Sequence, residues 1–68
     1  MGFKEDIAKI FREARKRAGL TQAEVAKKAG IHFNYYARIE RSEVAPRGDI
    51  INSIAKALGI KIKFPLED

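Results

Sequence analysis

The stretch Gly30–Glu40, GIHFNYYARIE, carries side chains that a surface facing only water does not require. After its glycine come His32, Phe33 and Asn34, and Arg38 follows one helical turn later. The Asn34 amide can donate and accept hydrogen bonds together, and the Arg38 guanidinium can donate two parallel bonds. These groups suit contact with a partner that presents fixed donors and acceptors. The helices and turns around these side chains determine which partner groups they can contact.

The first helix is predicted from one apolar stripe near the amino terminus. Its members recur at the three- and four-residue steps of a single helix face. Gly19 is expected to end this helix in a left-handed conformation. The stripe consists of Phe3, Ile7, Ile10, Phe11, Ala14 and Ala18.

A capping box predicts the start of a second helix, over about residues 21–29. The Thr21 hydroxyl can accept from the Glu24 amide, while the Glu24 carboxylate accepts from the Thr21 amide. Gly30 is expected to close this helix after little more than two turns. Its expected buried residues are Val25, Ala26 and Ala29.

Two more helices follow, separated by a loop over residues 42–46. The third is predicted over about 33–41, with Tyr36, Ile39 and Tyr35 facing inward. The fourth begins at Arg47 or Gly48 and ends at Gly59. Its stripe is Ile50, Ile51, Ile54, Ala55 and Leu58. The fold class is therefore predicted to be all-α, with four to five helices.

The end of the chain has a different pattern. From Ile60 to Leu66, apolar residues alternate with polar residues or proline, a period of two that is typical of a strand. A lone strand needs a partner, so Ile60, Ile62, Phe64 and Leu66 could pair with the same strand of a second copy. The alternative is an irregular tail that folds back onto the helices. We thus expect a domain over 1–60 and a tail or dimerisation strand over 61–68.

The positive charge is concentrated in the middle of the chain. The sequence has 14 Lys and Arg against 9 Asp and Glu, a formal charge of +5. Acids and bases cancel before residue 12 and after residue 48, so the excess lies between them. This favours a localised surface for a polyanion, although solvated helix faces remain the simpler alternative. The bases concerned are Arg12, Arg15, Lys16, Arg17, Lys27, Lys28, Arg38, Arg41 and Arg47.

Several classes of protein are disfavoured. There is no cysteine, which excludes disulfides and thiolate metal sites, and a single histidine makes any metal site weak. The sequence has no glycine-rich phosphate loop and no pair of carboxylates suited to catalysis, so we expect no enzyme, cofactor or metal. The apolar runs are far shorter than the ~20 residues of a membrane span, and no secretory leader is recognisable. We expect a cytoplasmic protein without a membrane partner.

The motifs together resemble one known family. In order, LTQAEVAKKAGI, then Ile39-Glu40-Arg41, then Pro46, then IAKALGI are similar to the lambda-repressor-like family (Cro/CI or XRE type) of helix-turn-helix domains. The resemblance covers about residues 7–60. It implies a DNA-binding domain whose third helix enters the major groove.

The resemblance also implies roles for individual residues. Base edges would be contacted by His32, Phe33, Asn34 and Arg38; phosphates would be contacted by Gln22, Lys27, Arg41, Arg47 and Gly48. Arg15 and Glu40 match a structural salt bridge, which we expect to be partly buried. Alternatives stay open: Arg38 could bond a phosphate or a nearby glutamate, and Asn34 could be an ordinary residue of the first helical turn. His32 could cap the helix, and Gly48 could simply begin one.

Three positions depart from the family pattern. Phe33 stands where a polar residue is usual, and it could pack on thymine methyl groups or against a protein partner. Tyr36 replaces an aliphatic residue and needs a partner for its hydroxyl. Ser42 replaces a glycine, which would cost about 1 kcal/mol in a left-handed turn.

The expected function is that of a sequence-specific regulator that binds double-stranded DNA as a homodimer on a palindromic operator. A short chain of this kind resembles some antitoxins and controller-type autorepressors, so a toxin could be a further partner. The alternative is an adaptor or coactivator that uses the same fold to bind a protein.

Overall fold

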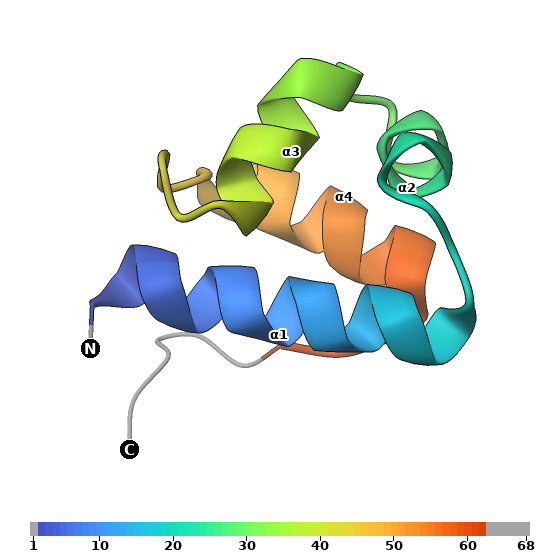
Figure 1. Ribbon diagram of the computed structural model, residues 1–68, viewed down its shortest axis with the longest axis horizontal. Helices are drawn as coiled ribbons and strands as arrows, with labels where there is room; N and C mark the ends of the chain where they lie inside the picture. Colours follow the sequence, from blue (N-terminus) through green and yellow to red (C-terminus); the bar gives the residue numbers. More distant parts are fainter. Residues whose placement is uncertain (1, 63–68) are drawn as a thin grey trace.

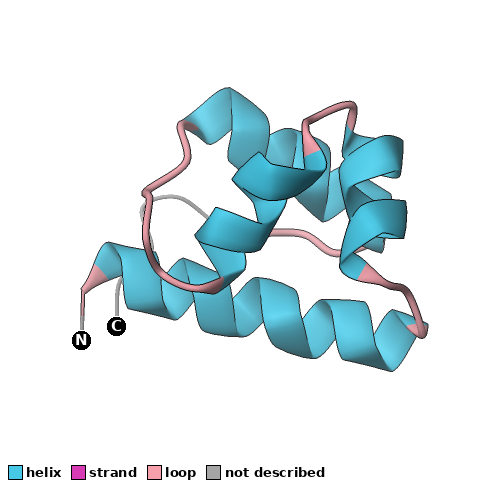
Figure 2. Cartoon of the chain, turned by 45° about the horizontal axis from the view of Figure 1, so that its top comes forward, coloured by secondary structure: helices cyan, strands magenta, loops and turns pink. Residues whose placement is uncertain are grey.

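The computed structural model describes residues 2–62, and in this range the chain forms four helices and no strand. They are α1 (Phe3–Ala18), α2 (Gln22–Ala29), α3 (Phe33–Glu40) and α4 (Gly48–Leu58). Short loops join them (Figure 2). The all-α prediction is confirmed.

The local signals for the second helix act as the sequence indicates. The Glu24 backbone N–H donates to the Thr21 hydroxyl at 3.0 Å, and the Thr21 N–H donates to the Glu24 carboxylate at 2.8 Å. At the other end Gly30 has a φ of 72°, which favours glycine because it has no Cβ. The Ile31 N–H then donates to the Ala26 carbonyl at 3.0 Å, so the chain turns sharply from α2 into α3.

The core lies where the four helices meet. α1 packs against α3 and α4, and α2 packs against the same two helices. α1 runs along one side of the molecule and α3 stands on the other, with α4 between and behind them (Figure 1). The largest fully buried side chains come from all four helices: Ile7, Phe11, Val25, Tyr36, Ile39, Ile51 and Ile54.

The predicted stripe of α1 is wrong at both of its ends. Phe3 is 41% exposed and Ala18 is also exposed, while Ala8, outside the stripe, is buried. With 16 residues α1 is ~24 Å long, twice the length of the 8-residue α3 that packs on it. Its ends therefore extend beyond the helices that could cover them.

The third helix ends one residue earlier than predicted, at Glu40. Arg41 is its C-cap, and Ser42 follows with a φ of 62°. This left-handed serine is the conformation expected from the glycine usual at this position. It turns the chain so that the Glu43 N–H donates to the Arg38 carbonyl at 3.0 Å.

The residues after α4 pack on the chain's own helices. Ile60 and Ile62 are partly buried against the core and form no strand. This is the folded-back alternative for these two residues. Phe64 and Leu66 lie outside the described residues, and pairing of the tail across a dimer stays a prediction.

Candidate nucleic-acid interface

The amino end of α3 is open to solvent. His32 is the N-cap, and its Nδ1 accepts from the Asn34 backbone N–H at 3.2 Å. A neutral imidazole that accepts at Nδ1 carries its hydrogen on Nε2, which is therefore a donor. Asn34 is exposed and Phe33 is 46% exposed. The amino end of α3 thus presents the Phe33 ring, the Asn34 amide and the His32 Nε2–H donor to solvent.

One exposed stripe continues from this turn along α3. Asn34, Arg38 and Arg41 recur at steps of four and three residues, and all three are exposed. Tyr36 and Ile39 lie on the opposite side of the helix and are fully buried. The packing of those two residues therefore fixes which side of α3 faces outward.

The two arginines of the stripe share one carboxylate. Arg41 Nε donates to Glu43 Oε2 at 2.7 Å, and Arg38 Nε donates to Glu43 Oε1 at 3.3 Å. All three side chains are about half exposed, at 53% for Arg38, 56% for Arg41 and 45% for Glu43. Hydrogen bonds, first from Arg41 and then from Arg38, hold the pKa of Glu43 below its usual value. The ion-pair alternative for Arg38 is thus observed.

The other predicted phosphate contacts are also exposed, apart from Gln22. Arg47 is the N-cap residue of α4 and donates to Asp49 at 3.3 Å. At Gly48 an added Cβ would meet no heavy atom within 4 Å, so the protein itself does not require glycine there. Lys27 is exposed near the end of α2.

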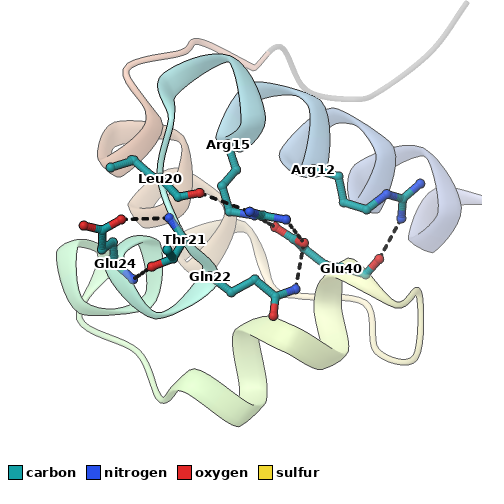
Figure 3. A network of polar contacts seen from close by, with 7 residues as sticks. All are labelled: Arg12, Arg15, Leu20, Thr21, Gln22, Glu24 and Glu40. Atoms are coloured by element: carbon teal, nitrogen blue, oxygen red, sulfur yellow. Dashed lines mark hydrogen bonds and ion pairs between the residues drawn. The ribbon is translucent and has the colours of Figure 1, made fainter.

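The buried carboxylate of Glu40 is the centre of a network of polar contacts (Figure 3). Arg15 holds Glu40 through two hydrogen bonds, Nε to Oε2 at 2.7 Å and Nη2 to Oε1 at 3.1 Å. The Glu40 side chain is only 2% exposed and that of Arg15 16%. Arg15 also donates to the Leu20 carbonyl at 3.0 Å, so the same guanidinium fixes the loop before α2.

Gln22 joins the same network. Its Nε2 donates to Glu40 Oε1 at 2.8 Å, which ties the first residue of α2 to the last residue of α3 (Figure 3). An amide nitrogen has two hydrogens, so one remains for an outside acceptor such as a phosphate. The expected role of Gln22 is compatible with this geometry.

The pKa values of the network follow from burial and from these bonds. Burial alone would raise the pKa of Glu40, but the hydrogen bonds from Arg15 and Gln22 and the nearby Tyr36 hydroxyl hold it below its usual value. Tyr36 has its pKa raised strongly, first by burial and then by its interaction with the adjacent Glu40 carboxylate. Its hydroxyl is buried and makes no hydrogen bond of standard geometry within residues 2–62, so the expected partner is lacking there.

Two participants were not assigned roles from the sequence. Arg12 Nη1 donates to the Glu40 backbone carbonyl at 2.7 Å and so caps the end of α3 (Figure 3). Its position one turn before Arg15 on α1 was the available signal. The sequence gives Glu43 no role of its own, because the bend at Ser42 that directs it toward two arginines depends on the folded chain.

Comparison with known proteins identifies the fold family. A helix-turn-helix family profile matches residues 11–64, most of the chain. The chain belongs to the helix-turn-helix family. The Immunity repressor protein of Bacillus phage phi105 is 34% identical over 56 residues, which is 82% of this chain and 39% of that protein. The helix-turn-helix chain thus spans well under half the length of this curated relative. No solved structure gives a significant match.

The family and the relative agree with the lambda-repressor-like (XRE) resemblance. Within the matched range, α2 and α3 are the two short consecutive helices joined by the turn at Gly30. The family match and the phage repressor together support a DNA-binding type of domain. None of the helices in the described part of the chain has the length and apolar character needed to cross a membrane.

Proposed function

We propose that this chain binds double-stranded DNA in a sequence-specific manner and regulates transcription as a homodimer. The observation that carries the proposal is the exposed stripe of α3, where Asn34, Arg38 and Arg41 face outward beside Phe33. A helix of this diameter fits the major groove, and amide and guanidinium groups on one stripe match the donors and acceptors of base edges.

The residues divide into two roles. His32, Phe33, Asn34 and Arg38 would contact bases, with Asn34 suited to adenine, Arg38 to guanine and the Phe33 ring to thymine methyl groups. Each correct bidentate contact would contribute ~1–3 kcal/mol of discrimination. Phosphates would be contacted by Gln22, Lys27, Arg41, Arg47 and the amino end of α4 at Gly48.

Two copies are proposed because one domain of this size contacts too few bases and phosphates to be selective. Ile60, Ile62, Phe64 and Leu66 are the proposed dimerisation residues. Ile60 and Ile62 are only partly buried on their own core, which leaves part of each side chain for a second copy. A twofold dimer would bind a palindrome with half-sites about one helical turn apart.

Repression is the favoured direction of regulation, since the phage relative is an immunity repressor. An antitoxin or controller-type autorepressor, with a toxin as further partner, is the finer form of this proposal. It rests on architecture alone.

The second candidate is a protein-binding adaptor built on the same fold. The observation in its favour is Phe33, a large aromatic side chain left 46% exposed on the recognition helix. In that case the Phe33 ring would pack against the surface of a protein partner, and duplex DNA would not displace that partner.

Selection of bound sites from a random duplex pool tests the proposal. The expected result is an enriched palindrome bound by two chains, with an affinity that falls with log salt at a slope near roughly −8 for ~4–5 phosphates per subunit. No enrichment, together with a slope near about −1, would exclude groove binding and favour the adaptor. Enrichment of a single half-site bound by one chain would retain DNA recognition and remove the dimer.

A further inference from the structure

Glu43 occupies an unexpected place for an acid, beside the proposed DNA-binding stripe. It lies in the loop after α3, and its carboxylate accepts from Arg38 of that helix and from Arg41, the C-cap residue. A carboxylate near a phosphate backbone is repelled, and exposed ion pairs add little stability. Folding alone therefore gives no strong reason for an acid at this site.

The geometry of the cluster leaves specific groups available. Arg41 uses Nε at 2.7 Å and Nη2 at 3.4 Å, so Glu43 holds it along one edge of the guanidinium. Arg38 donates only through Nε, at 3.3 Å, so the bond to Glu43 occupies neither of its Nη groups. Those two nitrogens are the pair that can donate in parallel to the O6 and N7 of guanine. Glu43 thus restrains Arg38 without occupying its outer end.

The charge of the cluster matters as much as its geometry. Arg38 and Arg41 with Glu43 carry a net charge of +1, where the two arginines alone would carry +2. Binding to DNA of random sequence is driven by charge, because it depends on phosphate neutralisation and release of counterions. Binding at a selected site also depends on correctly oriented base contacts. The shared Glu43 carboxylate therefore weakens binding to DNA of random sequence, while it supports the oriented base contacts made at a selected site.

We infer that Glu43 is a specificity-determining positioning residue: its carboxylate clamps Arg38 and Arg41, presents Arg38 to a base edge, and lowers attraction to non-cognate phosphates. The backbone supports this position, because Ser42 adopts a φ of 62° and the Glu43 N–H donates to the Arg38 carbonyl at 3.0 Å. The inference deepens the proposed function and depends on it.

Glu43→Gln tests the clamp because it removes the charge and keeps the size of the side chain. The probes are the random-sequence duplex pool and the duplex that the wild-type protein enriches from it. We expect the variant to bind the random pool about two- to fivefold more tightly, with a salt slope steeper by about one per subunit. Affinity for the enriched duplex should stay level or fall, so the ratio of the two affinities decreases.

Two matched variants separate the effect of the Glu43 carboxylate from the effects of net charge and of side-chain shape. Glu13→Gln makes the same change in charge at an exposed position on α1 and should leave the affinity ratio near wild type. Glu43→Asp keeps the charge and should keep the weaker affinity for the random pool. Equal changes in Glu43→Gln and Glu13→Gln would overturn the inference. So would loss of preference for a single cytosine with unchanged random binding, since Glu43 would then contact a base itself.

Failure of the inference can be told apart from failure of the proposed function. If the wild-type protein enriches a site and Glu43→Gln keeps the affinity ratio, only the clamp is wrong. If the wild-type protein enriches no site, the proposed function and the clamp are both wrong.

Discussion

Arg15 and Glu40 link α1 to the end of α3 through two hydrogen bonds, of 2.7 and 3.1 Å, in a nearly buried position. The same carboxylate accepts from Gln22 on α2, and its backbone carbonyl accepts from Arg12. One acid therefore sets the positions of three helices behind the proposed DNA-binding surface, while its charge is neutralised inside the domain.

Glu40→Gln is expected to destabilise the domain by about 3 kcal/mol, because it leaves the Arg15 guanidinium without a counter-charge in a nearly buried site. Urea unfolding followed by circular dichroism measures the loss. A small domain has only ~3–5 kcal/mol of net stability, so a variant already largely unfolded in buffer agrees with the expectation. The control is Glu43→Gln, whose pairs are exposed, and it should unfold close to wild type. Equal stability of the two variants would contradict the structural role of Glu40.

Stability should fall in acid, with Glu40 as the main cause. Its pKa in the folded state is held below the ordinary value of 4.5, so the unfolded chain binds more protons near this pH. The stabilisation is therefore complete above about pH 4.5 and is lost as the pH falls through the folded pKa. Unfolding free energies measured from neutral pH down to about pH 3 should show this decline.

Glu24 and Glu43 also have lowered pKa values, Glu24 first through the Thr21 backbone N–H and Glu43 first through Arg41. Both are exposed. The double variant Glu24→Gln with Glu43→Gln should therefore keep most of the acid dependence. A flat profile in that variant would show that the exposed acids, and not Glu40, are responsible.

Gly48→Ala separates a role in DNA contact from a role in starting a helix. Apart from its chain neighbours and the backbone of its own helix, an added Cβ meets no heavy atom within 4 Å, and alanine is the better helix former, so stability should be unchanged or slightly raised. If a phosphate approaches the amino end of α4, the methyl group should weaken duplex binding several-fold. Fluorescence anisotropy and thermal unfolding measure the two effects. The control is Asn52→Ala, exposed further along α4, which should also raise stability slightly but leave duplex binding unchanged. Unchanged duplex binding by Gly48→Ala would show that this glycine only begins α4 and makes no contact with DNA.

Asn34→Ala and Arg41→Ala test the division between base and phosphate contacts. Removal of the amide should blur the preference at one base pair by ~1–3 kcal/mol and leave binding to random duplex nearly unchanged. Removal of the guanidinium should weaken binding to all sequences alike and reduce the salt slope by about one per subunit. Binding-site selection with each variant measures both quantities. Identical effects on preference and slope would undo the assignment.

Patterns confined to one segment predicted the architecture well. The capping box at Thr21 and Glu24 and the turn at Gly30 are local, and both appear in the structure as the sequence indicates. The buried stripe predicted for α1 is too long, because periodicity indicates which face of a helix is apolar but not how far the neighbouring helices extend to cover it. Phe3 and Ala18 lie beyond that reach.

The polar contacts of the site were harder to predict because they join residues far apart in the chain. Resemblance to the family suggests the pair of Arg15 with Glu40. The spacing of Arg12 one turn before Arg15 places both on one face of α1, but nothing in the sequence indicates that Arg12 reaches the end of α3 or that Gln22 bonds the same carboxylate. Glu43 reaches its arginines only after the left-handed turn at Ser42, which depends on backbone geometry.

Titration of isotopically labelled protein with the enriched duplex, followed by amide chemical shifts, tests the central claim most directly. If α3 contacts DNA, the largest shifts should fall at Gln22, through His32 to Glu43, and at the amino end of α4 from Arg47 to Ile50, while the exposed side of α1 stays nearly unchanged. Large shifts confined to α1, or spread evenly over all four helices, would contradict the assignment of α3 as the helix that contacts DNA.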